Sequence, residues 1–136
     1  MMNYGEKAAE LFGKGYNCAQ SVAGAFAEKA GIPLETMLKL ASSFGGGMAG
    51  SRGVCGAVSG MLIALGAMNG YSDPGAKEEK QAHYALCRKA MDEFAEKNGS
   101  CICIELLNAQ KESGEKKRHC GELCRIAADI AAKYIK

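Results

Sequence analysis

The chain has 136 residues, a net charge of +2, and apolar and charged fractions of 48% and 24%, which are ordinary for one soluble globular domain over residues 1–136. No basic stripe with interleaved aromatic residues is present, so the composition argues against a nucleic-acid-binding surface. Residues 1–15 carry charges throughout and no apolar run, which predicts a cytoplasmic protein without a signal peptide.

The N-terminal part of the chain predicts three helices. The first is expected over residues 5–13. Asn17 and Gln20 then form a variant of the capping box, which places Cys18 at the first position of a second helix that runs on to a glycine. An isoleucine–proline break separates this helix from a short third one over residues 34–42.

A glycine-rich loop and the apolar segment after it form the centre of the chain. Residues 57–68 are rich in Ala, Leu and Met and exceed the usual length of a strand, which predicts a buried helix. The segment is too short for a membrane span, which needs about 20 apolar residues. Gly56, Gly60 and Ala64 recur every fourth residue, so one face is nearly bare and a second helix can lie close against it. We expect the loop to deliver Cys55 to the first turn of this helix.

The C-terminal half predicts two further helices. Residues 76–97 form a long amphipathic pattern, and residues 120–134 form a final one. Residues 100–107 do not decide between strand and helix, although Ser100 as a cap favours a short helix. The charged residues 108–119 predict a solvated loop. No alternating strand pattern is found, so we expect an all-α fold, an irregular bundle of five or six helices around a buried Gly/Ala-rich central helix.

The number of cysteines is the main functional signal. The chain has seven, and an odd number fits poorly with a closed disulfide framework. Inside a cell, clustered cysteines more often bind metal or carry out redox chemistry. Cysteines lie near four predicted helix starts, where free N–H groups and the helix dipole lower the pKa of a thiol. These candidate site residues are Cys18, Cys55, Cys103 and Cys120.

The other cysteines have a plainer explanation, because free cysteine also behaves as a small buried hydrophobe. Cys87 lies on the apolar stripe of the long helix with Tyr84 and Met91, and we expect it in the core. Cys101 is the rival of Cys103 for the third site position. Cys124 shares a helix face with Cys120 and is left open between core and chemistry.

The glycine loop supplies the candidate cofactor-binding residues, Gly45, Gly46, Gly47 and Gly53. Its backbone N–H groups could cradle an anion at a helix N-terminus. However, no Lys-Ser/Thr pair follows, and the strand that should precede a dinucleotide loop is missing. The alternative is a loop that needs positive φ angles and a close approach to the cysteines.

The arrangement of these residues resembles a family named for its C-GCAxxG-C-C pattern, whose members are described as redox-active. The resemblance covers almost the whole chain and includes the segment Cys55-Gly56-Ala57-Val58-Ser59-Gly60. It implies that the family's cysteines fall on Cys18, Cys55, Cys103 and Cys120. The family name gives Gly before Cys, whereas here Cys55 precedes Gly56. No C-x-x-C-H sequence is present, so haem is not implied.

Three functions compete at this point. The first is a thiol-based redox protein that cycles between dithiol and disulfide with an unidentified redox partner protein. The second is an electron carrier in which the same four cysteines would ligate an iron–sulfur cluster. The third is a helical partner-binding module with structural zinc or no metal. Zinc ligands are typically two to four residues apart, and that spacing would leave Cys18 and Cys55 unexplained.

Overall fold

The computed structural model describes residues 3–112 and 120–135. Its regular elements in this part of the chain are all helical, which confirms the predicted all-α class. The α-helices are α1 (Tyr4–Gly13), α2 (Cys18–Ala25), α3 (Ala27–Ala30), α4 (Leu34–Ala41), α5 (Gly56–Asn69), α6 (Lys77–Asn98), α7 (Cys103–Glu112) and α8 (Cys120–Tyr134), and Ser42–Phe44 form the 3-10 helix η1.

Two helix boundaries differ from the predictions. The second predicted helix is divided at Phe26, whose backbone leaves the ideal helical geometry, so that α2 and α3 are separate. The predicted loop over 108–119 is wrong for residues 108–112, which continue α7, and the rest of that segment lies outside the described residues. The charged composition that suggested a loop is equally compatible with a largely exposed helix.

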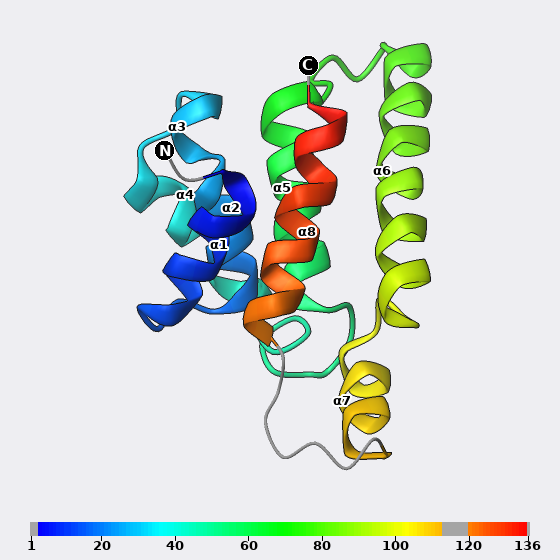
Figure 1. Cartoon of the computed structure of the whole chain (residues 1–136). Coiled ribbons are helices and arrows are strands. Elements are labelled where there is room, and N and C mark those ends of the chain that lie inside the picture. The colour runs from blue at the N-terminus through cyan, green and yellow to red at the C-terminus, as the bar shows by residue number, and fades with distance from the viewer. Residues whose placement is uncertain (1–2, 113–119, 136) are drawn as a thin grey trace.

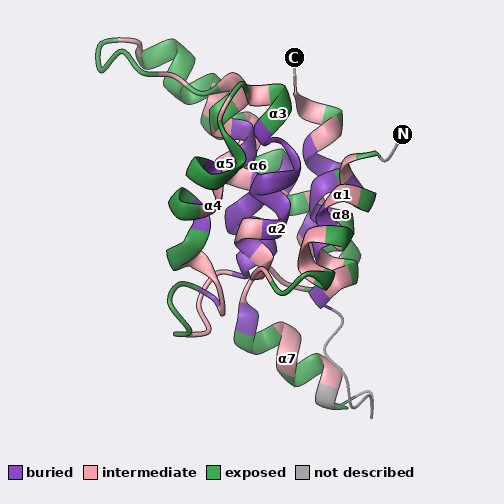
Figure 2. Cartoon of the chain, turned by 90° about the vertical axis from the view of Figure 1, so that its left-hand side faces the viewer, coloured by how far each residue is buried: buried purple, intermediate pink, exposed green. Residues whose placement is uncertain are grey.

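The helices are arranged in groups on either side of α5 and α8. Figure 1 shows α1 to α4 on one side of this pair and α6 on the other. The closest helix pairings are α1 with α8, α2 with α5 and α1 with α2. Helix α7 projects from the end of the bundle below the glycine loop (Figures 1 and 2). None of the described helices combines the length and the apolar character that crossing a membrane needs.

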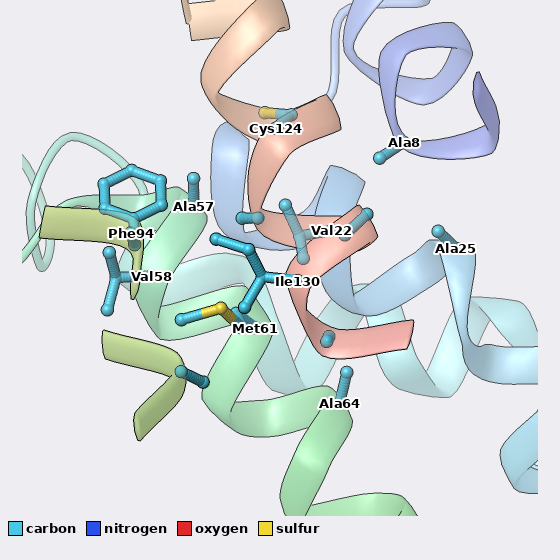
Figure 3. Close-up of a cluster of buried hydrophobic side chains, with 14 of the residues drawn as sticks. Ala8, Val22, Ala25, Ala57, Val58, Met61, Ala64, Phe94, Cys124 and Ile130 are labelled. Atoms are coloured by element: carbon cyan, nitrogen blue, oxygen red, sulfur yellow. The ribbon is translucent and has the colours of Figure 1, made fainter. Parts of the chain in front are cut away.

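The core fills the space between α2, α5, α6 and α8. Val22, Met61, Phe94 and Ile130 meet there and are fully buried (Figure 3). Ala90 and Phe94 are the fully buried residues of α6, and Leu86 and Cys87 pack against the core as half-buried residues. The predicted apolar stripe of this helix therefore does not stay buried along its length, and Tyr84 near the other end is 53% exposed.

The bare face of α5 lies directly against α2. A Cβ atom built on Gly60 would lie 2.6 Å from the carbonyl oxygen of Ala19 and 2.9 Å from the Cβ of Val22. No side chain fits in this space, so the glycine is required by the close approach of the two helices. This contact holds the start of α2, where Cys18 lies, beside the start of α5.

Candidate functional site

Four cysteines that are far apart in the sequence line one cavity of about 240 Å³. They come from four different helix starts, and the rest of the wall comes from the glycine loop, α6, α7 and α8. The lining residues are Cys18, Gly46, Gly47, Cys55, Gly56, Asn98, Cys103, Leu106, Leu107, Ala109, Gln110, Cys120 and Leu123. A second cavity of about 210 Å³ shares Cys18, Gly46 and Cys120 with it.

Cys18 is positioned by the predicted capping box. Asn17 accepts a hydrogen bond from the backbone N–H of Gln20 at 2.8 Å, and the Gln20 side chain accepts one from the N–H of Asn17 at 3.1 Å. The Asn17 amide also donates to the carbonyl of Ser42 at 3.1 Å, which ties the start of α2 to the segment before the glycine loop. The cap thus fixes both the helix start and its place in the site.

Cys55 and Cys103 are brought together by a short antiparallel pairing of backbone. Val54 and Ile102 form an isolated β-bridge. On either side of it, the N–H of Cys55 donates to the carbonyl of Cys101, and the N–H of Cys103 donates to the carbonyl of Gly53, both at 2.7 Å. These bonds place the start of α7 beside the start of α5, although α7 contributes little to the packing of the bundle.

The thiols of Cys103 and Cys101, on either side of Ile102, have different surroundings. Cys103 lines the cavity. The Cys101 thiol instead donates a hydrogen bond to the carbonyl of Met91 on α6, at a distance of 3.4 Å. Cys87 is half-buried and contacts Nε2 of His83 at 3.5 Å, away from the cavity lining. Among the two candidates for the third position, Cys103 is thus the one that reaches the cavity.

Cys120 and Cys18 approach each other from α8 and α2. The thiol of Cys18 is within hydrogen-bonding reach of Cys120 and also of Cys124, one turn further along α8. Cys124 is fully buried, and its thiol also lies 3.9 Å from the carbonyl of Cys18. Cys124 therefore borders the site from the core side without lining the cavity.

The glycine loop closes one side of the cavity through left-handed backbone. Gly46 and Gly47 have φ angles of 64° and 74° and line the cavity. A Cβ at Gly47 would lie 2.7 Å from the backbone nitrogen of Gly53, so this position needs glycine for space as well as for conformation. Gly45 and Gly53, the other two predicted cofactor-binding residues, do not line the cavity.

Gly56 allows Cys18 to lie next to Cys55. A Cβ on Gly56 would lie 3.0 Å from the Cβ of Cys18 and 3.3 Å from the backbone nitrogen of Ala19. The glycine that follows the central cysteine therefore makes room for the first cysteine of the site.

The matches to known proteins agree with this pattern of cysteines and glycines. A family model described as "Putative redox-active protein (C_GCAxxG_C_C)" matches residues 16–134. The chain belongs to this family. A protein of Archaeoglobus fulgidus, described only as an uncharacterized protein, is 33% identical over 140 residues, which cover 96% of this chain and 91% of the relative. No solved structure matches the chain. The family predicted from the sequence is thus confirmed.

The helix starts were expected to lower the pKa values of the site thiols of this C-GCAxxG-C-C protein. Burial instead helps to raise the pKa values of Cys18 and Cys55. The hydrogen bond with Cys120 lowers the pKa of Cys18, but the hydrogen bond with Cys124 and burial outweigh it, and the net pKa is strongly raised. Burial raises the pKa of Cys55, and the backbone N–H groups of Ala57 and Val58 lower it only in part. The expected lowering is therefore wrong for these two thiols, because desolvation and neighbouring thiols outweigh the helix dipole.

The raised pKa values predict a loss of stability at alkaline pH. The folded state holds the protons of Cys18 and Cys55 more tightly than the unfolded chain does. This contribution is fully present below about pH 8.5, the unfolded thiol pKa, and is lost as the pH rises towards the folded pKa values. Each thiol then removes up to about 1.4 kcal/mol of unfolding free energy per pH unit.

Urea unfolding under reducing conditions between pH 7 and pH 10 measures this loss. A Cys18→Ala/Cys55→Ala double variant is the control, since it keeps the lysines and tyrosines that also titrate in this range. The double variant should lose stability less steeply than the wild type. Equal slopes for the two proteins would contradict the burial argument.

The arrangement of the donor side chains decides whether they can hold a metal ion. Within residues 3–112 and 120–135, no group of three or more Cys, His, Asp or Glu side chains is arranged so that it could hold a metal ion. The four thiols share a cavity but do not form a ready tetrahedral site. The described side chains therefore offer no ready site for a single zinc ion.

Sequence reasoning missed the apolar wall of the site. Leu106 and Leu107 on α7 and Leu123 on α8 line the cavity together with the side chains of Asn98 and Gln110. Leu123 is half-buried and also packs against the core. The α7 residues had no usable signal, because their segment did not decide between helix and strand.

Proposed function

We propose that this chain is a cytoplasmic thiol redox protein of one domain that exchanges electrons with a partner protein through its cavity cysteines. The observation that carries the proposal is the meeting of Cys18, Cys55, Cys103 and Cys120 at one cavity. Four such residues from four helix starts are more than packing requires, since the core already contains larger apolar side chains. Membership of a family described as redox-active supports the same conclusion.

The reaction is the interconversion of dithiol and disulfide. Cys18 and Cys120 are one candidate pair, because their thiols lie within hydrogen-bonding reach. Cys55 and Cys103 are the other, because they flank the β-bridge between Val54 and Ile102 and both line the cavity. When a pair forms a disulfide, two thiols lose two protons and two electrons, and a disulfide of the partner gains them as two thiols.

The alternatives have less support. The proposed reaction needs only the cavity cysteines and a partner disulfide, so none of its steps uses zinc or an iron–sulfur cluster. A partner-binding module without chemistry would not need the thiols to converge. An anaerobic visible spectrum with iron and sulfide analysis distinguishes these alternatives, because brown protein with near-stoichiometric iron and labile sulfide would replace the thiol proposal by the cluster.

Thiol titration tests the proposal directly. Mild oxidation of reduced protein should remove two or four of the seven titratable thiols, and a reductant should restore them. The number of thiols should be measured under denaturing conditions, so that burial does not hide any of them. A thiol count that stays at seven after oxidation would overturn the proposal.

A further inference from the structure

We propose that Cys103 is the cysteine that attacks the partner disulfide, that Arg52 prepares it for the attack, and that Cys55 resolves the mixed disulfide. This inference rests on the proposed thiol redox function. It assigns different tasks to thiols that the sequence pattern treats as equivalent.

Arg52 contacts Cys103 with both its side chain and its backbone segment. Its guanidinium Nη1 lies 3.7 Å from the sulfur of Cys103 in an N–H···S contact. Its carbonyl accepts the N–H of Ile104 at 3.2 Å, and its own N–H donates to the carbonyl of Gly46 at 3.0 Å. One backbone hydrogen bond thus holds Arg52 against the start of α7, and the other holds it to the glycine loop.

The backbone of Arg52 is held in an unfavourable conformation. Its φ angle is 66°, in the left-handed region that costs a residue with a side chain about 1–2 kcal/mol. Such strain persists only where the surrounding structure fixes it, and it gathers at functional sites. Here it aims a guanidinium, which stays charged at all relevant pH values, at one thiol of the cavity.

A positive charge in contact with sulfur favours the thiolate, which is the attacking form of cysteine. The surroundings of Cys18 and Cys55 raise the pKa values of these two thiols, which suits them less for the first attack. Cys103 is only 5% exposed, so the partner disulfide must reach it through the cavity. The cavity volume of about 240 Å³ corresponds to about eight water molecules and admits a small disulfide.

The two steps balance in atoms and electrons. The Cys103 thiolate attacks one sulfur of the partner disulfide, forms a mixed disulfide and expels the other partner sulfur as a thiolate, which takes up a proton. Cys55 then gives its proton to solvent and attacks the Cys103 sulfur, which expels the second partner thiolate. The Cys55–Cys103 disulfide has lost two electrons, and the partner disulfide has been reduced to two thiols.

The first test measures the alkylation rate of each cysteine of the reduced protein by iodoacetamide at neutral pH, followed at the peptide level. Cys103 should react fastest. Arg52→Gln should lower the alkylation rate of Cys103 by about threefold to tenfold and leave that of Cys18 unchanged. Arg52→Lys should recover part of the rate of Cys103. The matched control Arg88→Gln on α6 should leave the rate of Cys103 unchanged. The difference between wild type and Arg52→Gln should shrink in 1 M salt, because salt screens a charge effect but not a packing effect.

The second test traps the mixed disulfide. Cys55→Ser protein treated with the small disulfide bis(2-hydroxyethyl) disulfide should accumulate one adduct on Cys103, and Cys55→Ala provides the same test if the serine variant does not fold. An adduct mainly on another cysteine would overturn this inference. An alkylation rate of Cys103 that is the same in the wild type and in Arg52→Gln would also overturn it. Wild-type protein that forms no disulfide at all would instead overturn the proposed function, while the alkylation order would still report on Arg52.

Discussion

Gly60→Ala should lower the free energy of unfolding by about 2–3 kcal/mol, because the new methyl group overpacks the contact between α2 and α5. It would meet the backbone carbonyl of Ala19 at 2.6 Å, and neither helix can retreat without losing its packing along the whole interface. Urea or thermal unfolding of the reduced protein measures the effect. The same variant should weaken the site, since α2 carries Cys18.

Gly66→Ala is the matched control for this prediction. Gly66 lies on the same helix, but a Cβ atom built on it meets nothing within 4 Å. Because alanine is the better helix former, this variant should be more stable than the wild type by about 0.5–1 kcal/mol. Similar changes in the free energy of unfolding for the two variants would show that helix propensity, and not the close approach of α2, determines the effect of Gly60→Ala.

Cys120→Ser should remove the Cys18–Cys120 disulfide, and Cys120→Ser/Cys124→Ser should lower the number of thiols lost on mild oxidation by two, because it removes both α8 thiols that lie near Cys18. Thiol counting before and after oxidation gives the result. Cys55 and Cys103 should still form their disulfide in both variants.

Cys87→Ser is the control for the cysteine variants. Cys87 lies on α6 beside His83 and does not line the cavity. Its replacement should leave the number of oxidation-sensitive thiols unchanged. If Cys87→Ser and Cys120→Ser behaved alike, the cavity would have no special role in oxidation.

The sequence predicted those parts of the site that depend on local patterns. The capping box of Asn17 and Gln20 correctly located the start of α2 and therefore Cys18. The bare face around Gly60 correctly indicated a close helix neighbour, since small residues at this spacing leave room for little else. Such signals are contained within one or two helical turns.

The parts that could not be predicted depend on contacts between distant segments. The bridge between Val54 and Ile102 joins two stretches that show no strand pattern, because each contributes a single bridging residue. The raised pKa of Cys18 arises from the hydrogen bond with Cys124 on α8 and from burial, neither of which a helix start reveals. The contact of Arg52 with Cys103 likewise depends on the path of the glycine loop.

Peptide mapping of disulfides in mildly oxidised protein, without reduction, is the most direct test of the central claim. The two proposed pairs predict cross-links only among the four cavity cysteines, with Cys18 joined to Cys120 and Cys55 joined to Cys103. Cross-links that mainly involve Cys87 or Cys101, or oxidised protein in which the four cavity cysteines stay unlinked, would contradict it.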